Sequence, residues 1–171
     1  MSTTTVTRDP RTLLTPEDFA AVAATVLDNN PGMKPGLAER ITTQALAFVA
    51  TAADTTAPMA PSRVVDEGWH ALVLHTRLYE DLARRLGKFV HHVPERPGST
   101  RDSYGPDWLT RTTDAIAAAG YPVDGDLWRG PGDDTIPVVA PAQHSPGPNC
   151  GPIVTCVSKP AEKEPTPTTT L

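Results

Sequence analysis

Apolar residues recur at helical spacing in four stretches of the chain, and each stretch is bounded by residues that start or stop helices. The first begins after Thr15, which is placed to act as the N-cap, with Pro16 as the first helical residue. It stops at the turn-forming residues 29–32. The second spans residues 35–54 and ends before Pro58. Both predict amphipathic helices with one face in a common core.

The third stretch is the longest, and it predicts one continuous helix over residues 62–86 that Gly87 ends in a left-handed conformation. At 100° per residue, one broad face of this helix holds Val65, Trp69, Leu72, Val73, Thr76, Tyr79 and Ala83. A fourth helix is predicted over residues 106–119. Beyond it, Leu127 and Trp128 form an apolar pair that we expect to close one end of a bundle.

No alternation typical of strands interrupts this pattern, so the sequence predicts an all-α protein: a compact bundle of four to five helices over residues 15–129. All nine aromatic residues fall within that range. The Thr-rich residues 1–14 are predicted to be a disordered lead-in. In residues 130–171, nine of 42 residues are proline, and we expect a disordered tail because it lacks the apolar surface that packing requires.

Charge and composition exclude several classes of partner. A net charge of −5 argues against a nucleic-acid or anionic-membrane surface. No apolar run approaches the ~18 residues of a membrane span, and the first residues lack the pattern of a secretion signal, so we expect a soluble cytoplasmic protein. The two cysteines, Cys150 and Cys156, form neither a disulfide scaffold nor a zinc ribbon and are predicted to be free thiols in the tail.

Four of the five histidines fall within residues 70–92 and carry the candidate chemistry. Asp66 and His70 are four residues apart, which places them one turn from each other on the same helical face. On a straight helix His75 lies about 140° around from His70, so the two could not bind one metal ion. The adjacent pair beyond the glycine turn could fold back over the helix. The candidate metal ligands are therefore Asp66, His70, and one of His91 and His92.

Three interpretations of this cluster remain open from the residues alone. A divalent ion such as zinc, iron or manganese could bind there and keep an open position that activates water. The same groups could perform acid–base chemistry without a metal. Alternatively, Asp66 fixes the tautomer of His70 while His91 bonds a helix end, with no ligand at all. Glu67 and Tyr79 are candidate neighbours of the site.

Two blocks of the chain are similar to a pattern of known proteins. One is Pro61–His70, followed by Leu74, Thr76, Tyr79 and Gly87; the other is His91–Pro94. Together they resemble a bacterial family related to plant glycine-rich domain-containing proteins. The resemblance implies a helical fold with a polar site and assigns no reaction. This chain has Leu72 where the pattern has a second histidine, and His75 where it has an aspartate, so one imidazole of the implied site is missing.

Two further functions follow from the tail. Its proline-rich composition favours extended conformations, so the chain could instead be a non-catalytic interaction module that captures a protein partner. The tail could also be a substrate for modification, with Ser145, Cys150, Thr155 and Cys156 as the reactive residues. Phosphate-binding glycine loops, nucleophile elbows, zinc-protease helices and calcium loops are absent from the sequence, which therefore assigns no catalytic residue.

Overall fold

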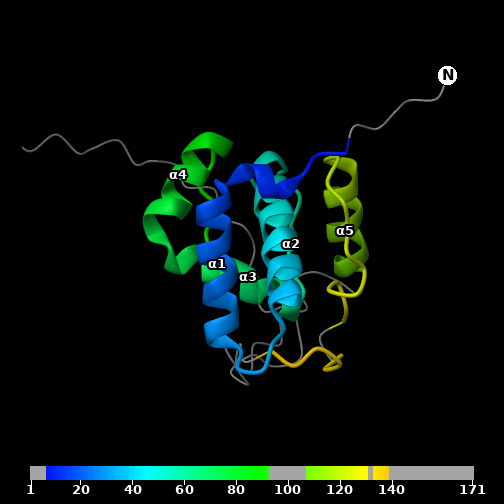
Figure 1. Cartoon of the computed structure of the whole chain (residues 1–171). Helices are drawn as coiled ribbons and strands as arrows, with labels where there is room; N and C mark the ends of the chain where they lie inside the picture. Colours follow the sequence, from blue (N-terminus) through cyan, green and yellow to red (C-terminus); the bar gives the residue numbers. More distant parts are fainter. Residues whose placement is uncertain (1–6, 93–106, 131–132, 139–171) are drawn as a thin grey trace, which may run out of the picture.

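The structure, a computed structural model, describes residues 7–92, 107–130 and 133–138 (Figure 1). All regular elements with assigned bounds in these ranges are helices, which confirms the predicted all-α fold. In chain order they are η1 (Pro10–Leu13), α1 (Pro16–Asn29), α2 (Pro35–Asp54), α3 (Arg63–Leu74), α4 (Thr76–Leu86) and α5 (Trp108–Ala118). None of the described helices is both long and apolar enough to cross a lipid bilayer.

Side-chain caps fix where two of the helices begin. The Thr15 hydroxyl accepts a hydrogen bond from the Asp18 amide (3.1 Å), and Pro16 follows as the first residue of α1. The Ser62 hydroxyl accepts one from the Val65 amide (3.2 Å) and so caps α3. At the other end of the third predicted helix, Gly87 adopts the left-handed conformation with φ +77°, as its position indicated.

The single helix predicted over residues 62–86 is wrong, because the chain breaks between α3 and α4 at His75 (φ −84°, ψ +66°). The break allows a contact that a straight helix would not. Trp69 and Tyr79 are hydrogen-bonded at 2.9 Å, whereas ten residues of straight helix would separate them by about 15 Å along the axis. No glycine or proline marks the break in the sequence, so periodicity alone runs through it.

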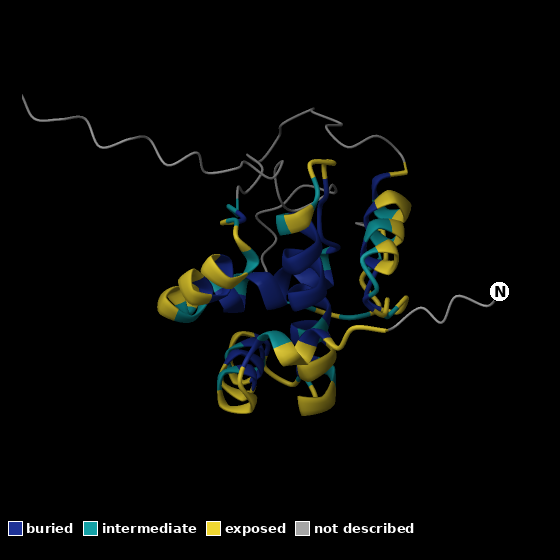
Figure 2. Cartoon of the chain, turned by 90° about the horizontal axis from the view of Figure 1, so that it is seen from above, coloured by how far each residue is buried: buried dark blue, intermediate teal, exposed yellow. Residues whose placement is uncertain are grey.

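Helix α2 lies at the centre and contacts every other described helix, while α1 and α3 also contact each other (Figure 1). Helix α3 is buried almost all round: eight of its twelve residues are buried, including two carboxylates. Figure 2 shows these buried residues in the middle of the bundle and the exposed ones on its outer sides. Gly68 allows α3 to lie close against α2, since a Cβ atom at this position would be 2.8 Å from the Ala45 Cβ.

The fold extends past both predicted domain boundaries. Before residue 15, the Arg8 amide donates to the Gly120 carbonyl (2.7 Å), η1 forms, and Leu14 is buried in the core. After residue 129, Ile136 and Val138 pack against the core. The predictions of disorder are therefore wrong for residues 8–14 and for the described residues 133–138. These apolar contacts come from segments too short to show a period. Residues 1–6, 131–132 and 139–171, which include both cysteines, lie outside the described residues.

The predicted closing contact is present. Trp128 is buried and donates from Nε1 to the Gln44 Oε1 (2.7 Å), and the Ser62 hydroxyl donates to the Leu127 carbonyl (2.5 Å). The segment after α5 is thereby attached to α2 and to the start of α3.

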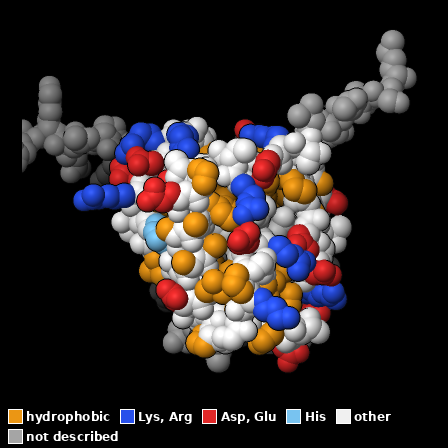
Figure 3. All heavy atoms as spheres, in the orientation of Figure 1, with side chains coloured by type: hydrophobic (Ala, Val, Ile, Leu, Met, Phe, Trp, Pro, Cys, Tyr) orange, Lys and Arg blue, Asp and Glu red, His pale blue; other side chains and the backbone are white. Residues whose placement is uncertain are grey.

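Apolar side chains line a surface groove between η1, α1 and α2, on the face shown in Figure 3. No histidine lines this groove.

Candidate metal site

Asp66 is the centre of the candidate site and lies in the first turn of α3, where its side chain is fully buried. His70 follows one turn later on the same face, and its Nε2 lies 3.5 Å from the Asp66 Oδ2. Both groups are therefore carried by one helix that is packed on α2 along its length. The spacing of four residues predicted this pair correctly.

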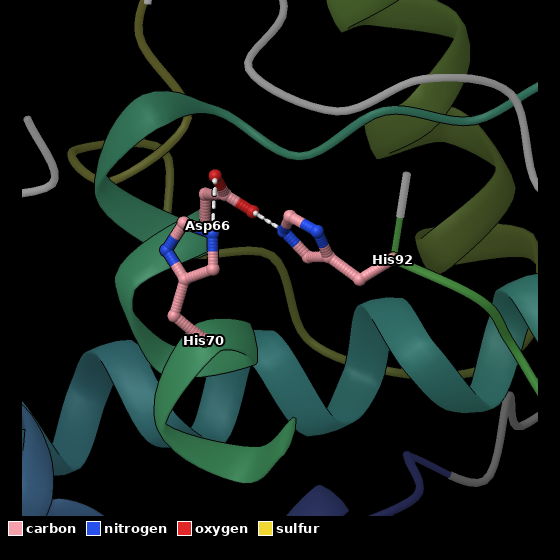
Figure 4. A group of neighbouring side chains, drawn as sticks. All are labelled: Asp66, His70 and His92. Atoms are coloured by element: carbon pink, nitrogen blue, oxygen red, sulfur yellow. Dashed lines mark hydrogen bonds and ion pairs between the residues drawn. The ribbon is translucent and has the colours of Figure 1, made fainter. Parts of the chain in front are cut away.

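His92 completes the group from another part of the chain. It belongs to residues 88–92, which follow the Gly87 turn and which we call the arm. The His92 Nε2 lies 3.1 Å from the Asp66 Oδ1, so the two carboxylate oxygens each face one imidazole (Figure 4). The rings of His70 and His92 are 4.4 Å apart between centroids. The predicted folding back of the arm over α3 is thus present for this histidine.

The three side chains are close enough to share an ion. One ligand atom from each of Asp66, His70 and His92 lies within 4.8 Å of the other two. Metal–ligand bonds of about 2.0–2.1 Å in tetrahedral geometry would separate neighbouring ligand atoms by about 3.3 Å. Each imidazole nitrogen lies at a similar distance, 3.1 or 3.5 Å, from one of the two Asp66 oxygens. Within the described residues this is the one group of its kind. It could hold a metal ion with three protein ligands.

The three side chains of the group are exposed to solvent to different degrees. Asp66 is 0% exposed, His92 10% and His70 30%. The carboxylate therefore lies innermost, and solvent reaches the group on the side of His70. Three protein ligands with one accessible side differ from a closed structural zinc site, which uses four protein ligands.

The other candidate residues lie elsewhere. His91, predicted as an alternative to its neighbour, stacks on Phe89 with the ring centroids 4.7 Å apart and is not part of the group. His75 lies at the break between α3 and α4, where its Nε2 is 2.8 Å from the Thr25 hydroxyl of α1. The expectation that it could not share an ion with His70 agrees with this position, although the helix is not straight.

Glu67 is buried beside Asp66 but faces a different partner. Its Oε2 accepts a hydrogen bond from the Asn30 Nδ2 (3.1 Å), which also donates to the Val26 carbonyl (2.8 Å). Glu67 is therefore directed toward the end of α1 and is not a member of the metal-ligating group. This contact was not predictable from the chain pattern, because Asn30 lies among the turn-forming residues 29–32 that stop a helix.

Tyr79 lies outside the metal-ligating group and contacts the arm that carries His92. It accepts a hydrogen bond from the Trp69 Nε1 (2.9 Å) and donates one to the Val90 carbonyl (2.6 Å), and all three residues are buried. Burial raises the pKa of Tyr79 to about 12, against the opposing effect of the hydrogen bond from Trp69. The hydroxyl thus keeps its proton, and its donor role, at any ordinary pH. Its partner is a main-chain carbonyl, which no side-chain pattern reveals.

The fold and the site together define a small all-α protein with a three-residue candidate metal site. A model of the UCP032817-like family matches residues 20–102, a little under half of the chain, and this range includes Asp66, His70 and His92. Comparison with curated proteins and with solved structures gave no match.

Proposed function

We propose that this chain binds a divalent transition-metal ion through a carboxylate oxygen of Asp66 and one ring nitrogen each of His70 and His92. The observation that carries the proposal is the fully buried Asp66, whose two oxygens lie 3.1 and 3.5 Å from two imidazoles that come from separate parts of the chain. A buried carboxylate needs compensating partners. An ion at the centre of the group would add a positive charge beside this carboxylate.

The ligand set indicates which ions to test. Two imidazoles with one carboxylate suit zinc, iron and manganese, and the combination with open positions is characteristic of non-haem iron(II) centres. The chain offers no soft ligand in this group. We therefore propose one of these three ions rather than copper(I) or an iron–sulfur cluster.

The accessible side at His70 supports a reactive rather than a purely structural role. An ion held by three protein ligands keeps at least one position for water, and such an ion supplies a Lewis acid or an activated water. The residues of this chain would bind the ion, hold the two imidazoles toward it, and exclude water from the Asp66 side. The substrate of such a centre is not assigned.

We also propose that the chain is a bacterial relative of the plant glycine-rich domain-containing proteins. The blocks that carry this resemblance, Pro61–His70 and His91–Pro94, contain all three proposed ligands. The substitution of Leu72 for a histidine is compatible with the site, because Leu72 is fully buried in the core cluster and not part of the ligand group.

The experiment is metal analysis of the purified, untagged full-length protein, followed by thermal unfolding of the metal-free protein with added zinc, iron(II) or manganese. Binding to the native state raises the melting temperature in proportion to the logarithm of ion concentration. His70→Ala should abolish the rise. His91→Ala is the matched control, because it removes a neighbouring histidine outside the group, and it should keep the rise.

Two results would refute the proposal. In the first, no ion copurifies and none raises the melting temperature; the three residues then form a hydrogen-bonded cluster without a ligand. In the second, His70→Ala and His91→Ala respond to the ion equally, which would place the binding elsewhere in the chain.

A further inference from the structure

We infer that Tyr79 is a positioning residue that holds His92 against Asp66, acting through the main-chain carbonyl of Val90. Its effect on metal binding rests on the proposed function, whereas its effect on the position of His92 does not. Tyr79 is not a member of the ligand group, so it would act through the contacts that connect it to His92.

The three proposed ligands are held to different degrees by their own secondary structure. Asp66 and His70 are fixed relative to each other by one turn of α3. His92 lies on the arm, which is not helical, six residues beyond Leu86, the last residue of α4. The distance from His92 to Asp66 therefore depends on what fastens the arm to the rest of the bundle.

Besides the contacts of His92 itself, hydrogen bonds from two side chains to main-chain carbonyls hold the described residues of the arm to the bundle. At its start, the Lys88 Nζ donates to the carbonyls of Ala52 (3.3 Å) and Thr55 (3.0 Å) at the end of α2. In its middle, the Tyr79 hydroxyl donates to the carbonyl of Val90, two residues before His92. Of these two contacts, that of Tyr79 is the shorter, is fully buried and is nearer to the histidine.

Tyr79 also orients the ring against which His92 packs. The Trp69 Nε1 donates to the same hydroxyl, and the Trp69 ring lies 4.6 Å from the His92 ring between centroids. One hydroxyl thus restrains His92 in two ways, through its main chain and through its aromatic neighbour. Partners of metal ligands that lie outside the ligand group commonly change metal affinity 10- to 100-fold when they are removed.

The test is Tyr79→Phe in the otherwise intact full-length chain, which removes the hydroxyl and keeps the ring. In the metal-free protein, the rate at which diethyl pyrocarbonate modifies each histidine is measured by peptide mass spectrometry. The His92 side chain is 10% exposed in the structure, and we expect it to react severalfold faster in the variant. His75, which contacts α1, should keep its rate. Tyr121→Phe is the matched control, because it makes the same change at another buried tyrosine.

Two outcomes of this footprint overturn the inference. If the His92 rate is unchanged, the hydroxyl does not position it. If the rates of His92 and His75 rise together, the substitution loosens the whole bundle and the role of Tyr79 is structural only.

Titration calorimetry with zinc adds the functional consequence. We expect Tyr79→Phe to weaken binding about tenfold and the matched Tyr121→Phe to leave it unchanged. Equal weakening by the two substitutions overturns the inference. If wild-type protein binds no zinc, iron(II) or manganese, the proposed function fails, and the metal-free footprint still decides the role of Tyr79.

Discussion

Asp66 and Glu67 are neighbours in the same turn of α3, and both are buried, yet their surroundings differ. Asp66 faces two imidazoles, one from α3 and one from the arm. Glu67 faces the amide of Asn30 at the end of α1. An imidazole nitrogen can donate a proton or bind a metal ion, whereas the amide nitrogen of asparagine only donates.

The difference shows that burial of a carboxylate does not by itself make a metal site. Burial makes each of these side chains require partners, and the partners decide what the carboxylate can do. Around Glu67 the partner is an amide that is also bonded to the main chain of α1, so the contact links two helices. Around Asp66 the partners are groups that could turn toward an ion.

The largest expected effect comes from the feature that buries both carboxylates, the close approach of α3 to α2. Gly68→Ala would place a Cβ 2.8 Å from the Ala45 Cβ and 2.9 Å from the Ile41 carbonyl oxygen, so the helices must separate. We expect a loss of about 3 kcal/mol of unfolding free energy, measured by urea denaturation. Gly36→Ala in α2 is the control, since its Cβ would meet nothing within 4 Å. Equal stability of the two variants would contradict the argument.

The next effect separates the two carboxylates directly. At an ion concentration 100 times the dissociation constant, binding adds about 2.7 kcal/mol of stability, which corresponds to a melting-temperature rise of roughly 5–10 °C. We expect Asp66→Asn to lose most of this rise, because it removes the anionic ligand, and Glu67→Gln to retain it. Thermal unfolding with and without zinc measures both. A rise lost equally in the two variants would show that Glu67 belongs to the site.

The smallest effect concerns a third carboxylate, Asp124, which is partly exposed and paired with a permanent cation. Bidentate hydrogen bonds from Arg40 (2.6 and 2.8 Å) and its positive charge hold the pKa of Asp124 below its usual value, although partial burial opposes the shift. Its contribution is therefore complete above the unfolded pKa of about 3.9 and is lost as the pH falls through the lower folded value.

Asp124→Asn should accordingly cost about 0.5–1 kcal/mol at pH 7, a modest value because Arg40 is 46% exposed on its side chain. The difference between variant and wild type should shrink as the pH is lowered below about 4. Urea denaturation across this pH range measures it. A difference that is constant with pH would show that the carboxylate charge does not stabilise the fold.

Local chemistry made much of the fold predictable. Helix α1 begins at Thr15 and Pro16, and helix α4 ends at Gly87, because the side chains or backbone preferences of these residues favour those positions. The Asp66–His70 pair was equally predictable, since both members lie on one helix and their spacing fixes their separation.

The remaining parts depend on contacts between distant residues, which a pattern along the chain does not encode. The break at His75 accompanies a hydrogen bond between Trp69 and Tyr79, which lie on either side of it. His92 lies beside Asp66 whereas His91 lies beside Phe89, and two adjacent histidines with different partners look alike in sequence. The buried Glu67 accepts a hydrogen bond from Asn30, which the pattern along the chain identifies only as a turn residue.

The hydrogen bond across the break at His75 also depends on the number of residues between Trp69 and Tyr79. Deleting one residue within α4 before Tyr79 would rotate the rest of that helix by about 100° and shift it by about 1.5 Å. The phenol would then turn away from the indole, even though every side chain of the site was retained. Length variation in this protein should therefore be tolerated least between Trp69 and Tyr79, where the spacing itself carries structural information.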